Sequence, residues 1–146
     1  MIDQERFYEI CNLMVLPAFL LVPLVVTDQG ELQVVLIRRE PTDRFWPNLY
    51  HIPGTILRKG DTFASAYGRI IREDLHFPEI IDEPKFVANL TNSTQRGEAV
   101  SMIYWLQIGK KTNGDVFNWH NLPKDMIPEH REIVQIAAQH FIGFYP

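Results

Sequence analysis

The chain has 146 residues, and 14 basic against 18 acidic residues give it a net charge of −4 at pH 7. Apolar residues make up 46% and charged residues 22%, which predicts one globular domain over residues 1–146 and excludes a disordered or fibrous protein. Because there is no basic excess, we expect neither nucleic acid nor an anionic membrane surface as a partner, although a few cations can hold a small phosphorylated ligand. The single cysteine excludes an intramolecular disulfide and fits a reducing compartment.

The N-terminal part contains an uncharged apolar run over residues 13–26. This run is shorter than the about 20 residues of a membrane span and is interrupted by Pro17 and Pro23. A signal peptide starts with basic residues, whereas this chain starts with Asp3 and Glu5. We therefore expect a core strand here, no membrane segment and a cytoplasmic protein.

The first half of the chain predicts a helix, a hairpin and a second helix. A leading helix is expected within residues 1–16, followed by a core over 18–142. Val, Leu and Ile dominate 18–27 and 32–39, and the turn signal at 28–30 joins them into a buried hairpin. After a loop rich in proline and aromatic residues, apolar positions at helical spacing predict a helix over 61–75.

The second half predicts strands and a final helix. Strands are expected over 86–90 and 100–108, with a loop over 91–97 between them. The turn signal Asn113-Gly114 precedes a strand over 116–119, and a helix follows over 128–141. This order predicts an α+β fold, an α/β/α sandwich with a mixed sheet between helices.

The most informative segment runs from His51-Ile52-Pro53-Gly54 through residues 55–61 and continues over 69–77 as Arg-Ile-Ile-Arg-Glu-Asp-Leu-His-Phe. It resembles the box of the Nudix hydrolases, in which Gly, five residues and Glu are followed after seven residues by Arg-Glu-aliphatic-any-Glu-Glu-any-Gly. In this register Arg69, Ile71 and Glu73 match the pattern outright, and Asp61 and Asp74 match it in charge. Three positions depart from the pattern: Thr55, Ile70 and His76.

The resemblance implies a Nudix fold and a site for Mg²⁺ or Mn²⁺. It assigns Glu73 and Asp74 as metal ligands and Arg69 as the residue that orients them, and Glu98 is a further candidate ligand. Ile70 removes one carboxylate from the helix face that Glu73 and Asp74 share, which weakens a site for a cation that prefers several oxygen ligands. An exposed acidic pair at a helix end is the alternative interpretation of Glu73 and Asp74.

Further candidates lie outside the box. A histidine can accept a proton from water near neutral pH, so His120 is a candidate general base beside His51, and a polar surface residue is the alternative. Arg38 and Arg39 are candidate phosphate ligands, although neighbours on a strand point to opposite sides. Trp46 is a candidate stacking residue for a base or sugar, or else a hydrophobic cover for the sheet edge.

The resemblance therefore predicts a divergent Mg²⁺-dependent hydrolase of a nucleoside-diphosphate-linked compound, of which a nucleotide sugar is one example. The aliphatic residue after Arg69 is similar to the GDP-mannose mannosyl hydrolases, in which water attacks the sugar carbon. A Nudix-fold nucleotide-binding or regulatory module without catalysis is the alternative, and a scaffold that binds partners through its aromatic residues is a third. Nudix domains often dimerise, so a homodimer is one assembly that the resemblance allows.

Overall fold

The computed structural model describes residues 3–145. The elements in chain order are α1 (Gln4–Leu13), β1 (Leu16–Val26), β2 (Leu32–Arg38), β3 (Tyr50–His51), β4 (Gly54–Ile56), α2 (Phe63–Glu73), β5 (Lys85–Thr94), β6 (Gly97–Gln107), β7 (Asp115–Asn118) and α3 (Pro128–Phe144). The strands form a seven-stranded sheet in the order β3-β2-β1-β6-β5, with β4 paired to β1 and β7 paired to β2. The pairing of β1 with β6 is parallel and the others are antiparallel, so the predicted mixed sheet is confirmed.

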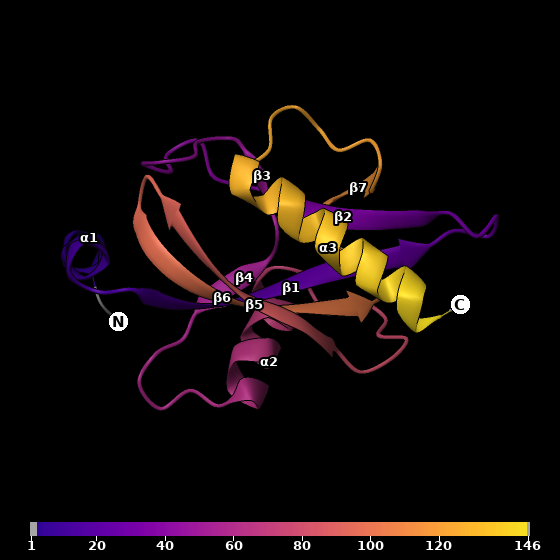
Figure 1. Ribbon diagram of the computed structural model, residues 1–146, viewed down its shortest axis with the longest axis horizontal. Coiled ribbons are helices and arrows are strands. Elements are labelled where there is room, and N and C mark those ends of the chain that lie inside the picture. Colours follow the sequence, from indigo (N-terminus) through magenta and orange to yellow (C-terminus); the bar gives the residue numbers. More distant parts are fainter. Residues whose placement is uncertain (1–2, 146) are drawn as a thin grey trace.

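Strand β1 forms the centre of the sheet and separates two hydrophobic clusters. Successive side chains of a strand point to opposite faces. On one face Leu20, Val22 and Leu24 pack with α3, and on the other face Phe19 and Leu21 pack with α2. The two helices therefore cover opposite faces of the sheet, as the sequence predicts for an α/β/α sandwich (Figure 1).

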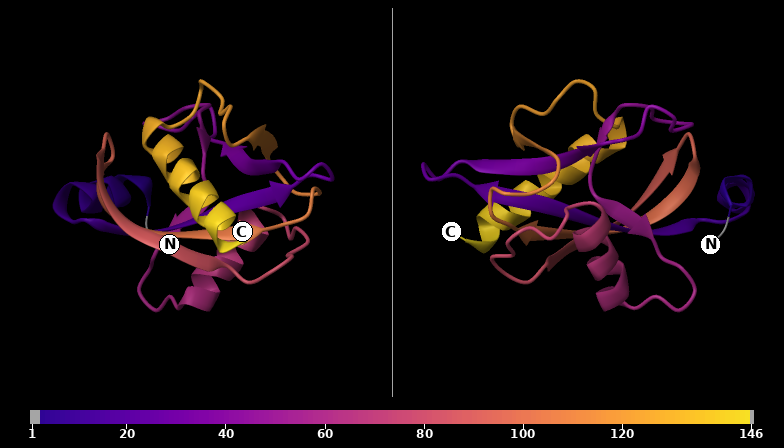
Figure 2. Two further views of the ribbon diagram at one scale, coloured as in Figure 1. Left: turned by 45° about the vertical axis from the view of Figure 1, so that its right-hand side comes forward. Right: turned by 180° about the vertical axis from the view of Figure 1, so that it is seen from behind.

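The hairpin of β5 and β6 corrects the predicted loop over 91–97. Thr94 pairs with Gly97, and only Gln95 and Arg96 form the turn between the strands. The end of β5 consists of polar residues, and it is a strand because it pairs with β6 rather than because of an apolar pattern. The hairpin bends away from the rest of the sheet (Figure 2). Arg96 belongs to the turn at its tip.

Helix α2 is shorter than the predicted 61–75. It begins after Thr62, whose hydroxyl accepts from the Ser65 N–H, while the Ser65 hydroxyl accepts from the Thr62 N–H. It ends at Asp74, because His76 and Phe77 adopt left-handed backbone conformations with φ of 55° and 57°. Asp74 therefore caps the helix rather than lying within it.

Helix α1 lies beside the hairpin of β5 and β6, at the end of the molecule (Figure 1). Residues 1 and 2 of the predicted 1–16 lie outside the described part of the chain. Asp3 caps the helix by accepting from the Arg6 N–H at 2.9 Å. Within residues 3–145, none of the helices combines the length and the apolar character that crossing a membrane requires.

Candidate functional site

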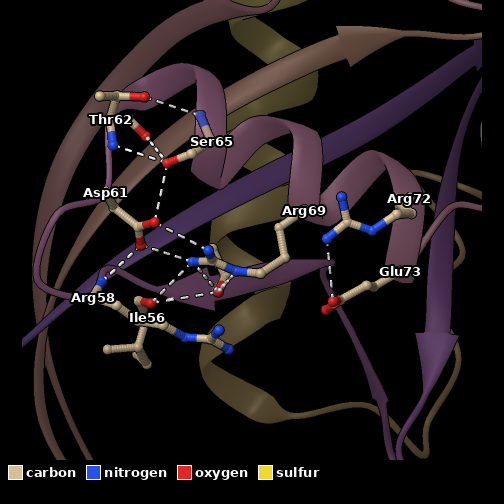
Figure 3. A network of polar contacts seen from close by, with 9 residues as sticks. Ile56, Arg58, Asp61, Thr62, Ser65, Arg69, Arg72 and Glu73 are labelled. Carbon is tan, nitrogen blue, oxygen red and sulfur yellow. Dashed lines mark hydrogen bonds and ion pairs between the residues drawn. The ribbon is translucent and has the colours of Figure 1, made fainter. Parts of the chain in front are cut away.

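Arg69 of α2 joins the helix to the loop before it through a dense polar network (Figure 3). Its guanidinium forms an ion pair of 2.9 Å with Asp61 and donates to the Thr55 hydroxyl at 3.0 and 3.1 Å. The side chains of Arg69 and Asp61 are only 11% and 10% exposed. The hydrogen bonds from Arg69 hold the pKa of Asp61 below its ordinary value, and the N–H of Arg58 adds to this effect. The network fixes the backbone between β4 and α2.

The two predicted helix carboxylates differ in their surroundings. Glu73 is 57% exposed and faces Arg72 at 3.5 Å, whereas Asp74 is half-buried and accepts from the Gly54 N–H at 3.2 Å. Burial raises the pKa of Asp74 although that N–H opposes the shift, and the charge of Glu73 raises it further. Ile70, at the position of the missing carboxylate, is 1% exposed and belongs to the hydrophobic cluster between α2 and the sheet.

The residues present do not fit a conventional magnesium or manganese site. Such a cation takes several oxygen ligands in octahedral geometry. Across residues 3–145, no group of three or more His, Cys, Asp and Glu side chains gathers in a way that could hold a metal. Glu98 is exposed on β6 and is not brought together with Glu73 and Asp74. The predicted metal ligands therefore do not form one set.

A pocket of about 200 Å³ lies on the α3 face of the sheet. It is lined by residues of β1, β4, the hairpin of β5 and β6, and the beginning of α3, and by Arg39 and Trp46 from the loop after β2. Gly54 and Thr55 line it while also contacting Asp74 and Arg69, so β4 connects the pocket with the α2 network. The polar side chains of its lining come from Arg39, His51, Thr55, Asn92, Thr94, Arg96, Glu98, Ser101, Glu129 and His130.

The two pocket histidines are neutral. The Nδ1 atom of His130 accepts from the Ile52 N–H at 2.9 Å, and the Nδ1 atom of His51 lies 2.9 Å from the Ile52 carbonyl oxygen, to which it must donate. Burial lowers the pKa of His51 to about 4, with a further contribution from Arg39. Burial lowers the pKa of His130 to about 3, and the positive charges of Arg39 and Arg96 contribute to the shift. His51 therefore keeps an unprotonated Nε2 and His130 a protonated one.

Arg39 is held in place by Asp43. The Asp43 carboxylate accepts from the Arg39 Nε at 2.7 Å and also from the N–H groups of Phe45 and Trp46. Although burial acts in the opposite direction, these N–H groups and the Arg39 guanidinium hold the pKa of Asp43 below its ordinary value. This arrangement fixes the loop after β2 and places Trp46, which is buried, against the pocket.

Arg38 and His120 do not line the pocket. Arg38 forms an ion pair of 3.0 Å with Asp125 and stacks on Tyr50, with 4.1 Å between its guanidinium carbon and the ring centre. His120 is exposed, and its ring lies 3.7 Å from that of Trp119. For both residues the geometry agrees with the surface alternative rather than with a place in the pocket.

Sequence reasoning missed Arg96, Glu129 and His130. Arg96 falls in the segment predicted as a loop, because residues 91–97 are all polar or glycine and lack the apolar pattern of a strand. Glu129 and His130 follow Pro128 in the first turn of α3. An acidic residue in the first turn stabilises any helix, so Glu129 by itself does not indicate a functional site. The Oε2 atom of Glu129 is buried, without a hydrogen-bond partner within residues 3–145.

Comparison with known proteins finds relatives by structure alone. No family model matches the sequence, and no curated protein does. The NUDIX domain of Shewanella oneidensis NrtR, solved with ADP ribose, is similar over 96% of this chain and 94% of that chain, with a TM-score of 0.69 and 16% identity. Shewanella oneidensis NrtR complexed with a 27mer DNA is similar over 86% of this chain and 62% of that chain, with a TM-score of 0.65 and 14% identity.

A Caenorhabditis elegans Ap4A hydrolase is similar over 88% of this chain and 99% of that chain, with a TM-score of 0.66 and 12% identity. The likenesses to these proteins extend over most of the chain and include the mixed sheet with a helix on each face. They confirm the fold that the residues 51–77 predict. The chain has the Nudix fold.

Proposed function

We propose that this protein binds a nucleotide-type ligand in the pocket on the α3 face of the sheet. The observation that carries the proposal is the chemistry of the lining, where the guanidinium groups of Arg39 and Arg96 lie with the neutral rings of His51 and His130. Guanidinium groups match the geometry of phosphate oxygens, and neutral imidazoles supply one donor and one acceptor each. The ADP ribose in the NrtR structure shows a ligand of this chemical class in a protein of the same fold.

Hydrolysis of such a ligand is the second candidate function. It is favoured by the ion pair of Arg69 with Asp61, because the resemblance gives Arg69 an orienting role in the box. The contact of Asp74 with the Gly54 N–H brings one box carboxylate next to the pocket wall. Against it stands the incomplete set of metal ligands described above, so we rank ligand binding first. The nucleotide sugar suggested by the sequence stays a prediction about the substrate.

The unprotonated Nε2 of His51 gives the second candidate a base within the pocket. A general base must be able to accept a proton at the operating pH and lie within reach of the attacking water. Burial lowers the pKa of His51 to about 4, so its Nε2 is a weak base at neutral pH, although the contact of its Nδ1 with the Ile52 carbonyl oxygen orients the ring. Its advantage over His120 as a candidate base is its position alone, because His51 lines the pocket and His120 does not.

The test is isothermal titration calorimetry with ADP ribose, ADP and GDP-mannose, with Mg²⁺ or with a chelator, followed by analysis for products. Arg39→Met is compared with Arg38→Met as the control. The two arginines are adjacent at the end of β2, but of the two only Arg39 lines the pocket. We expect binding that persists with the chelator and that Arg39→Met weakens about tenfold or more. Equal binding by both variants contradicts this pocket as the site.

Turnover decides between the two candidate functions. Products that form with Mg²⁺ and disappear with the chelator establish the hydrolase, and Glu73→Gln should then reduce the rate. Unchanged turnover by Glu73→Gln contradicts the role that the resemblance gives to Glu73. Absence of binding by the wild-type protein across the whole panel contradicts the proposed function itself.

A further inference from the structure

Arg96 lines the pocket and forms no ion pair within residues 3–145. It occupies the turn between β5 and β6 and is half-buried. Across residues 3–145, no carboxylate lies within ion-pair distance of its guanidinium, and that guanidinium donates no hydrogen bond. The nearby carboxylate of Asp43 is occupied by Arg39 and by two backbone N–H groups. Burial lowers the pKa of Arg96, which reflects the cost of removing this charge from water.

Two aromatic rings hold the guanidinium in place. Its central carbon lies 5.5 Å from the ring centre of Phe7, in α1, and 5.5 Å from the ring centre of Trp46, in the loop after β2. Contacts of a guanidinium with ring faces are attractive, and they leave its N–H donors free, because these point outward in the plane of the group. Arg96 is thus fixed in position while its donors remain available.

Helix α1 is closely fitted to this turn. Gly97, the residue after Arg96, has a φ of 141°, and a Cβ atom added there would lie 2.6 Å from the backbone oxygen of Cys11, in α1. Tyr8 of the same helix packs edge-on against Phe45, with ring centres 5.4 Å apart. The helix therefore contacts both the hairpin turn and the loop that carries Trp46.

We propose that Arg96 binds a phosphate group of the pocket ligand and that Phe7 and Trp46 act as positioning residues for its guanidinium. The proposal rests on the proposed function, since it concerns the ligand of the same pocket. A partly desolvated guanidinium with free donors on a pocket wall gains a charge-assisted, bidentate partner when a phosphate arrives. Helix α1, which lies outside the sheet and its two covering helices, thereby becomes part of the binding site.

The test for Arg96 is calorimetric titration with inorganic pyrophosphate and, separately, with ADP. Arg96→Met should weaken the affinity for both about 10- to 100-fold, because one charge-assisted contact is lost. Arg44→Met is the matched control, because Arg44 also stacks near α1, 4.6 Å from the Tyr8 ring centre, but is exposed and does not line the pocket. Equal affinities of Arg96→Met and the wild type overturn the proposal.

The test for Phe7 needs a readout that a purely structural role does not move. The Nε–Hε proton of Arg96 should show an upfield ring-current shift in the NMR spectrum, and Phe7→Leu should remove part of it and weaken pyrophosphate binding. Phe7→Tyr should restore both the shift and the affinity. A change in melting temperature without a change in the Arg96 resonance or in affinity overturns the positioning role.

The outcomes separate this proposal from the proposed function. If the wild type binds ADP but Arg96→Met binds it equally well, the pocket function stands and the role of Arg96 falls. If the wild type binds pyrophosphate through Arg96 but no nucleotide of the panel, the role of Arg96 stands and the nucleotide function falls. If the wild type binds no pyrophosphate and no ADP, the proposal for Arg96 is overturned.

Discussion

Arg69 and Asp61, eight positions apart in the chain, form a 2.9 Å ion pair that closes the loop between β4 and α2. The same guanidinium donates to the Thr55 hydroxyl, and the Asp61 carboxylate accepts from the Arg58 N–H at 2.7 Å and from the Ser65 hydroxyl at 3.0 Å. Thr55 stands where the Nudix pattern has glycine. In this chain Thr55 adds a hydrogen-bond acceptor to the network. The network therefore helps to fix the conformation of the loop between β4 and α2.

We expect Asp61→Asn to destabilise the protein at neutral pH and to do so less in acid. Because the folded protein depresses the pKa of Asp61, the stabilisation is present above the unfolded-state pKa of about 4 and is lost as the pH falls through the lower folded value. Urea unfolding of both proteins at pH 7 and pH 3 measures the difference. Asp28→Asn is the control, because Asp28 is 89% exposed in its ion pair with Lys110. A difference that grows in acid contradicts the prediction.

Ile70→Glu should destabilise the protein rather than supply an additional metal ligand. The new carboxylate would enter the hydrophobic cluster that contains Phe19 and Leu75, and burying a charge without a partner costs about 3 kcal/mol or more. Ile70→Val keeps the apolar character and should cost only about 1 kcal/mol. Thermal unfolding compares the two variants, and a stable Ile70→Glu protein with Mg²⁺-dependent turnover would refute this interpretation of the site.

His130 should make the protein less stable below pH 6.5. Its pKa is lowered to about 3 in the folded state, so the unfolded chain binds the proton first, and stability falls as the pH drops from about 6.5 toward 3. His130→Asn offers an oxygen to the Ile52 N–H but does not titrate. Between pH 7 and pH 5 the wild type should lose about 2 kcal/mol more than this variant in chemical unfolding. Parallel pH profiles would show that His130 is not the titrating group.

His76→Gly should stabilise the protein by about 0.5–1 kcal/mol. His76 has a φ of 55° at the position where the Nudix pattern has glycine, and a left-handed backbone costs a residue with a side chain about 1–2 kcal/mol. The greater freedom of glycine in the unfolded chain offsets part of the gain. His76 is exposed, so His76→Ala is the control that removes the ring and keeps the strain. A His76→Gly protein no more stable than His76→Ala would contradict the prediction that the left-handed backbone at this position is costly.

The elements of the fold could be predicted from the sequence because apolar periodicity and turn residues act locally. The hairpin of β1 and β2 and helices α2 and α3 lie where the pattern predicts them, within a few residues at the ends. The exception is the end of β5, where polar residues such as Asn92 and Ser93 lack the apolar pattern of a strand. Their strand conformation results from hydrogen bonds to β6, which no local pattern encodes.

The candidate site could be predicted only in part. The structure joins the box residues Asp61 and Arg69 in one ion pair, and Arg39 and Trp46, which were candidate binding residues, line the pocket. The predicted ligands Glu73, Asp74 and Glu98 do not form one group, because Glu98 lies on the hairpin and Glu73 faces solvent. Strand alternation shows that Arg38 and Arg39 differ in direction, but not which of them faces the pocket.

By itself the sequence determined the fold class and identified the box over residues 51–77. Both depend on apolar periodicity and motif spacing, which concern residues near one another in the chain. Only the tertiary structure decided which side chains share the pocket. It brings Phe7, Trp46 and Arg96 together from a leading helix, a loop and a hairpin turn. In the described part of the chain it also places no carboxylate within ion-pair distance of Arg96, because the nearby Asp43 pairs with Arg39. The packing of distant segments decides this, and no local sequence pattern does.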